Sequence, residues 1–311
     1  MSLRIKRSWS QRIWLRSTIC LLLFTSPLIS QTDWLAHQSS VFRINYTEQD
    51  KQIVKAFAEL LETEYSKLVA RSGIRFARPV HIFLTPSEQA FNQLTGHFIP
   101  DWGEGVADPA RSVIVLKSPN LSHNYDTLPK LIRHELTHIL VGNLGAAPHT
   151  IPKWFHEGMA IYFSYDEEFA GGKAISKALL TDSVVPLDEI DKVLKFHREK
   201  ARLAYEESYS AILYMEKAFG ERGIVDFLQE LEQSKEFDDT FLQVFGIDLY
   251  EFELDWYHFI EDKYRWRFLI DFETFLWIFI PLMLILAFIA IRLRNRRILK
   301  RWEDEERLAS P

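Results

Sequence analysis

The motif that most constrains the fold of this chain is His134-Glu135-Leu136-Thr137-His138, whose spacing suits one helical face. The residues around it predict a helix over Thr127–Val141. Positions four apart on an α-helix lie one above the other on the same face. The two imidazoles can therefore reach one metal ion, and Glu135 can reach a water molecule bound to that ion.

A second motif, Trp154-Phe155-His156-Glu157-Gly158, opens a helix predicted over Trp154–Tyr162. Eighteen residues separate His138 from Glu157, enough for the chain to reverse and present Glu157 as a third ligand. Two histidines and one carboxylate leave the fourth position of a tetrahedral zinc open, as catalysis requires. The alternative is an ordinary helix with solvated or hydrogen-bonded His and Glu. Apolar neighbours instead indicate a buried helix, where a Glu without a partner or a metal is costly.

Together the two motifs resemble those of the gluzincin zinc peptidases, H-E-x-x-H followed after eighteen residues by W-x-x-E-G. The resemblance is closest to small bacterial, often membrane-attached peptidase-like domains of that superfamily, and it covers about Thr47–Trp256. It implies one Zn²⁺ per chain, held by His134, His138 and Glu157, with Glu135 as the general base. It also implies an α+β fold, a compact thermolysin-like zincin domain with a small N-terminal sheet and a mostly helical C-terminal half.

The same resemblance implies a place for the substrate backbone. In gluzincins an edge strand just before the metal helix binds the substrate by β-addition. Gly105, Val106 and Ala107 stand at this position and are the candidate peptide cradle. The strand predicted next, Arg111–Leu116, is the alternative cradle, and a purely structural strand fits the sequence equally well.

A hydroxyl donor for the developing oxyanion is expected on a helix predicted over Ala201–Phe219. Related domains carry a similar Tyr-rich helix after the third ligand, and a Tyr hydroxyl can stabilise a tetrahedral oxyanion. Tyr205 is the first candidate and Tyr209 the second, with aromatic helix packing as the alternative for each. The sequence departs from the larger gluzincins at Ile161, where some carry an Asp that orients a ligand histidine.

The C-terminal region contains a run of seventeen residues, Phe275–Ile291, without a charge or a strongly polar side chain. This length is at the short end for a helix that spans a bilayer. The cations that follow at once place the C-terminus in the cytoplasm by the positive-inside rule. They are Arg292, Arg294, Arg296, Arg297, Lys300 and Arg301. We therefore predict a transmembrane helix over 274–293 and a basic cytoplasmic tail over 294–311.

The N-terminus has the layout of a secretory signal peptide over residues 1–30. Five cations precede a short apolar run, Ile19–Phe24, and cleavage is expected near Ser30. An uncleaved signal anchor is the alternative. In either case residues 31–270 are expected to form one peptidase-like domain on the extracytoplasmic side of the cell membrane, periplasmic or extracellular.

The charge distribution argues against a nucleic-acid partner. The chain holds 37 Lys/Arg and 43 Asp/Glu, and the two basic ends leave 25 and 39 of these for residues 31–291. An acidic body between basic ends fits a membrane protein, and its negative charge would repel the sugar-phosphate backbone of a nucleic acid. The single cysteine, Cys20, excludes an internal disulfide framework.

The expected function is that of a membrane-anchored zinc metallopeptidase acting on a peptide or protein substrate. In this hypothesis zinc polarises the scissile carbonyl, and Glu135 moves a proton from water to the leaving amine while Tyr205 supports the oxyanion. One alternative is a catalytically silent, membrane-tethered binding module on the same fold. Another is a zinc hydrolase with a non-peptide substrate. The presence of all three ligands and the base argues against the silent module.

Overall fold

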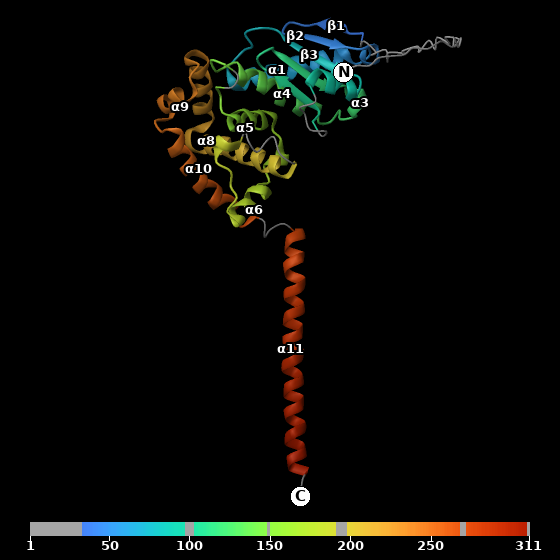
Figure 1. Cartoon of the computed structure of the whole chain (residues 1–311), viewed down its shortest axis with the longest axis vertical. Helices are drawn as coiled ribbons and strands as arrows, with labels where there is room; N and C mark the ends of the chain where they lie inside the picture. Colours follow the sequence, from blue (N-terminus) through green and yellow to red (C-terminus); the bar gives the residue numbers. More distant parts are fainter. Residues whose placement is uncertain (1–32, 97–102, 148–149, 191–197, 268–271, 310–311) are drawn as a thin grey trace, which may run out of the picture. The chain divides into compact units, whose positions relative to one another are not determined.

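A computed structural model describes residues 33–96, 103–147, 150–190, 198–267 and 272–309 (Figure 1). The predicted signal peptide over 1–30 lies outside these residues. The chain divides into two units, Met1–Asp33 and Trp34–Pro311, and the fold described below is that of the second unit.

A five-stranded mixed sheet forms the N-terminal part of this unit, with strand order β1-β2-β3-β5-β4. The inner strands β2, β3 and β5 run parallel, and the outer strands β1 and β4 pair antiparallel to their neighbours. Ile44, Ile82 and Ile114 lie in register across the inner strands and are buried, which marks the core face of the sheet. The strands are β1 (Leu35–Gln38), β2 (Phe42–Tyr46), β3 (Val80–Thr85), β4 (Gly105–Asp108) and β5 (Val113–Lys117).

The strand predicted over Arg111–Leu116 is β5, whereas β1 and β2 were not predicted. Helices α1 and α4 pack against each other, α1 against β2 and α4 against β4. The helices of this half are α1 (Val54–Ser72), α2 (Glu88–Thr95), α3 (Pro119–Ser122) and α4 (Leu128–Gly142), after the short 3₁₀ helix η1 (Glu48–Asp50).

The second half of the body is helical and built around aromatic residues. Trp154 stacks on Phe252, and Phe155 packs edge-on against Phe227 and Phe237. The predicted helix end at Gly220 is a break, with φ 75° and ψ 164°, inside one longer helix, α8. The helices here are α5 (Lys153–Ser164), α6 (Lys173–Thr181), α8 (Arg198–Ser234), α9 (Phe237–Phe245) and α10 (Leu249–Tyr264), with 3₁₀ helices η2 (Glu167–Phe169) and η3 (Leu187–Glu189).

The last helix, α11 (Phe272–Ala309), contains the predicted transmembrane run. Within the described part of the chain it is the one helix long and apolar enough to cross a membrane, and its apolar window is not buried by other residues. Most of the predicted tail continues the same helix. A small N-terminal sheet, a mostly helical remainder and a C-terminal apolar helix confirm the predicted α+β fold class.

Candidate metal centre

Helices α4 and α5 carry the two predicted motifs and pack directly against each other. On α5, every residue from Trp154 to Ser164 is buried, because α4 and α8 enclose the helix. Gly158 permits the close approach to α8: a Cβ atom there would lie 2.4 Å from the carbonyl oxygen of Ser208. This contact seats the preceding residue, Glu157, against the histidines of α4.

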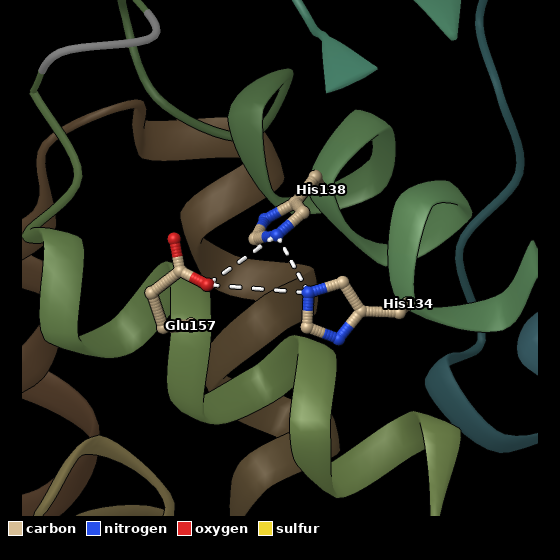
Figure 2. Close-up of side chains that lie close together, drawn as sticks. All are labelled: His134, His138 and Glu157. Carbon is tan, nitrogen blue, oxygen red and sulfur yellow. Dashed lines mark hydrogen bonds and ion pairs between the residues drawn. The ribbon is translucent and has the colours of Figure 1, made fainter. Parts of the chain in front are cut away.

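The three predicted ligands converge, as Figure 2 shows. The two Nε2 atoms of His134 and His138 are 3.2 Å apart. Oε2 of Glu157 lies 4.0 Å from the first and 3.6 Å from the second. Two ligand atoms about 2.05 Å from a tetrahedral zinc are themselves about 3.3 Å apart. The donor types and spacings therefore fit a metal ion of this size.

Each ligand is held in the protonation state that metal binding requires. Burial lowers the pKa of His134, and it lowers the pKa of His138 well below its ordinary value, so both imidazoles are neutral. Burial alone would raise the pKa of Glu157, but the neighbouring charge of Lys153, first of all, outweighs burial, and this pKa is lowered to about 2. Nζ of Lys153 lies 2.9 Å from Oε1 of Glu157, which leaves Oε2 directed at the histidines.

Glu135, the predicted base, is buried and lies beside strand β4. A Cβ atom at Gly105 would be 3.0 Å from Oε1 of Glu135. Burial, and then the charge of Glu157, raise the pKa of Glu135 to about 8. A carboxyl group with a pKa this close to neutrality can both take up and release a proton during a reaction.

The predicted peptide cradle, Gly105 to Ala107, lies in β4 at the edge of the sheet. The amide of Lys117 donates to the carbonyl of Glu104, and pairing alternates along an antiparallel ladder. The backbone groups of Gly105 and Ala107 therefore point away from β5, whereas those of Val106 point toward it. The alternative strand, β5, is paired on both sides, with β3 and β4, so it offers no open edge.

The two tyrosine candidates are in different surroundings. The ring of Tyr205 lies 5.4 Å from that of Phe169. Burial first, and then the charges of Glu157 and Glu135, raise the pKa of Tyr205. Tyr209 packs at the margin of the hydrophobic core. Burial, and to a smaller extent Tyr209, raise the pKa of Tyr264. The structure therefore brings the first candidate near the centre.

Two charged residues near the centre were not predicted. Lys153 stands one helical turn before Glu157, a spacing at which side chains on a helix meet, so the sequence contained that signal. Asp166 follows α5 and raises the pKa of His134 by its charge. No local pattern marks Asp166, because the turn after α5 brings it back toward the ligand.

Known proteins are similar to this chain in sequence and in structure. The chain is 21% identical over 230 residues to the uncharacterized protein YhcO of Bacillus subtilis (strain 168). The matched region covers 68% of this chain and 67% of that protein. The structure is similar to that of native leukotriene A4 hydrolase from Saccharomyces cerevisiae, with a TM-score of 0.43 and 11% sequence identity. This match covers 69% of the present chain and 36% of the hydrolase. A second structure of the native yeast enzyme gives TM-score 0.45, 15% identity, and coverage of 78% and 38%. The chain thus spans less than two fifths of those hydrolases.

A family model also matches most of the chain. The model of the Peptidase MA superfamily matches residues 62–262, which contain both ligand motifs, the cradle strand and Tyr205. The matched region is 201 of the 311 residues. The chain therefore belongs to the Peptidase MA superfamily, a family of peptidase-type hydrolases.

Proposed function

We propose that this protein is a membrane-anchored, zinc-dependent peptidase that hydrolyses peptide bonds outside the cytoplasm. The observation that carries the proposal is the convergence of His134, His138 and Glu157 next to buried Glu135 and an open strand edge. Zinc held by these three residues would polarise the scissile carbonyl and make a water molecule more acidic. The remaining steps belong to residues of the chain itself.

The substrate backbone binds along β4 in this proposal. The outward-facing amide and carbonyl groups of Gly105 and Ala107 can add an extended peptide as a further strand of the sheet. Because Gly105 has no side chain, that peptide passes close to Glu135. Binding to a fixed edge orients one peptide bond toward the ligand cluster before reaction, which lowers the entropic cost of the chemical step.

Glu135 moves the proton. Its carboxylate accepts a proton from the attacking water and then donates it to the amine of the leaving peptide. The buried position of Glu135 supports this role, because few water molecules compete for the proton there. Tyr205 donates a hydrogen bond to the former carbonyl oxygen as negative charge develops on it.

Helix α11 anchors the peptidase in the membrane. Its apolar run is followed by six cations within ten residues, and such an excess of Lys and Arg favours the cytoplasmic side. With the C-terminus in the cytoplasm, the body that carries the centre lies on the opposite side of the membrane. The substrate is therefore a peptide or protein outside the cytoplasm.

The proposal is tested by measuring zinc content and peptide cleavage on the full chain in detergent. The substrate is a quenched-fluorescent unfolded protein, and the variants are Glu135→Gln and Glu157→Ala, with Lys51→Gln as a control at an exposed site. We expect about one zinc per wild-type chain, zinc without cleavage in Glu135→Gln, and loss of both in Glu157→Ala.

Three outcomes would refute parts of the proposal. Full cleavage by zinc-loaded Glu135→Gln would remove Glu135 as the base. If the wild-type chain takes up no zinc, the enzyme hypothesis is refuted and the alternative of a catalytically silent binding module remains. Zinc uptake without cleavage of any peptide would direct the search to non-peptide substrates.

A further inference from the structure

A cavity of about 670 Å³ lies among α1, α4, α8 and the C-terminal end of α5, and the proposed reaction does not use it. Leu68, Ala70, Phe163 and Val225 supply apolar walls. Its polar lining comes from Lys67, Arg71, Arg133, Tyr165, Glu221 and Arg222.

The cavity is cationic within an acidic protein. Four Lys/Arg and one acid line it, whereas residues 31–291 hold 25 Lys/Arg and 39 Asp/Glu. Neighbouring acids pair with these cations: Lys67 and Arg133 share Glu64, and Arg222 pairs with Asp226. Even with both of these acids included, cations outnumber acids by four to three. The cavity therefore attracts anions while the overall charge of the body repels them.

Two guanidinium groups flank one exposed aromatic ring in this cavity. The Cζ atoms of Arg71 and Arg133 lie 4.7 and 5.1 Å from the ring centroid of Tyr165. Arg71 is held in place because its Nε donates to Glu221 at 2.7 Å and its Nη1 donates to the carbonyl of Tyr162 at 3.1 Å. The cation at this position is thus fixed before any ligand arrives.

Arg133 has unused donors. Its ion pair with Glu64 runs through Nε at 2.9 Å. In the part of the chain that the structure describes, neither Nη atom of Arg133 donates a hydrogen bond. The planar guanidinium fork matches a carboxylate in two parallel hydrogen bonds. The Nη atoms of Arg133 are therefore the natural contact for a carboxylate that enters the cavity.

Two lining residues of the cavity are next in sequence to residues at the metal centre. Arg133 directly precedes the ligand His134 on α4. Tyr165 directly precedes Asp166, whose charge acts on His134. A peptide that reaches from the open edge of β4 along α4 could place a side chain in this cavity. The apolar walls suit the methylene groups of an Asp or Glu side chain, and the cations suit its carboxylate.

We propose that this cavity is an exosite that binds an acidic side chain of the peptide substrate, remote from the cleaved bond. The assignment rests on the proposed peptidase function and adds a substrate class to it: peptides that carry Asp or Glu. Binding in the exosite strengthens association with such substrates and leaves the chemistry at Glu135 unchanged. The interaction is screened by salt, because the cavity is open to solvent.

The test measures binding without cleavage. Full-length Glu135→Gln in detergent is titrated into a fluorescein-labelled acidic decapeptide and its Gln/Asn analogue, and anisotropy is recorded at two salt concentrations. The same titration is made with a chain that also carries Lys67→Gln and Arg222→Gln. These two side chains are 56% and 80% exposed, so replacing them should not unfold the protein. Lys51→Gln, at an exposed cation outside the cavity, is the matched control.

We expect the acidic peptide to bind more tightly than its analogue, and the double variant to weaken it by about tenfold. The Lys51→Gln control should bind like the parent. Equal binding of both peptides, or an unchanged affinity in the double variant, would overturn the exosite. Displacement of the acidic peptide by an equal concentration of inorganic phosphate would assign the cavity to simple anions and overturn the peptide assignment.

Failure of the exosite and failure of the catalytic proposal give different results. Loss of acidic preference in a chain that still binds zinc and cleaves neutral peptides would refute the exosite alone. Absence of zinc and cleavage would refute the peptidase, and the binding titration would still decide whether the cavity takes carboxylates.

Discussion

Gly105 and Glu135 are in contact distance across the interface between strand β4 and helix α4. A Cβ atom added at Gly105 would lie 3.0 Å from Oε1 of Glu135 and 2.7 Å from Cδ2 of the buried Leu116. Neither neighbour can move freely, because both are packed in the protein interior. The strand that is proposed to hold the substrate therefore also determines where the proposed base lies.

Gly105→Ala should reduce the rate of peptide cleavage by about a hundredfold, because a displaced base or substrate strand loses its alignment with the reacting bond. Zinc content should remain that of the wild type, since the atoms nearest the added methyl group belong to Leu116 and Glu135 and not to a proposed ligand. Gly171→Ala is the control, as a Cβ atom there meets nothing within 4 Å. Cleavage by Gly105→Ala at the wild-type rate would show that Glu135 does not depend on this contact.

Tyr205→Phe should lower kcat by about a hundredfold with little change in KM, because a hydrogen bond to the oxyanion acts in the transition state. Tyr209→Phe should leave both parameters nearly unchanged, since that side chain packs at the margin of the core. Steady-state kinetics on the two variants separate the candidates. A larger loss in Tyr209→Phe would reverse their assignment.

Gly158→Ala should destabilise the body by about 2 kcal/mol, the usual scale for overpacking a core. The added methyl group would meet the backbone oxygen of Ser208 at 2.4 Å and Cγ1 of Ile212 at 2.6 Å, and the backbone atom cannot rotate away. Thermal unfolding in detergent measures the effect against Gly171→Ala. An unchanged midpoint would mean that α5 and α8 separate without cost.

Titration of Glu207 should lower the free energy of unfolding as pH rises. Burial and the charges of Glu206 and Glu253 outweigh a hydrogen bond from the amide of Val185 and raise the pKa of Glu207 to about 8. Its Oε2 atom has no hydrogen-bond partner among the described residues. The folded chain therefore holds this proton more tightly than the unfolded chain, and the stabilisation is complete below about pH 4.5.

Between about pH 4.5 and pH 8 this stabilisation is lost at up to about 1.4 kcal/mol per pH unit. Glu207→Gln keeps an acceptor for Val185 and carries no titrating proton, so its unfolding midpoint should vary less over this range. Unfolding midpoints of the two chains at pH 5 and pH 8 test this. Parallel pH dependence in both would assign the loss of stability to other groups.

Much of the candidate centre could be predicted from local patterns. His134 and His138 share a face because they are four residues apart on a helix, and the structure places their Nε2 atoms 3.2 Å apart. The motif around Glu157 predicted a second helix, and the structure directs this carboxylate at both histidines. The apolar run of α11 was visible because length and hydropathy alone describe such a helix. These features depend on helix periodicity or composition, both of which are local.

Other features depended on contacts between distant segments. Strands β1 and β2 were missed because short, exposed or mixed strands carry a weak periodic signal. The open edge of β4 follows from its pairing with β5, and its contact with Glu135 follows from the packing of α4 on the sheet. The cationic cavity joins Arg71, Arg133 and Arg222 from three helices far apart in the sequence. The sequence by itself determined which side chains share a helical face, whereas tertiary packing decided which faces meet, because only burial of distant apolar surfaces sets those contacts.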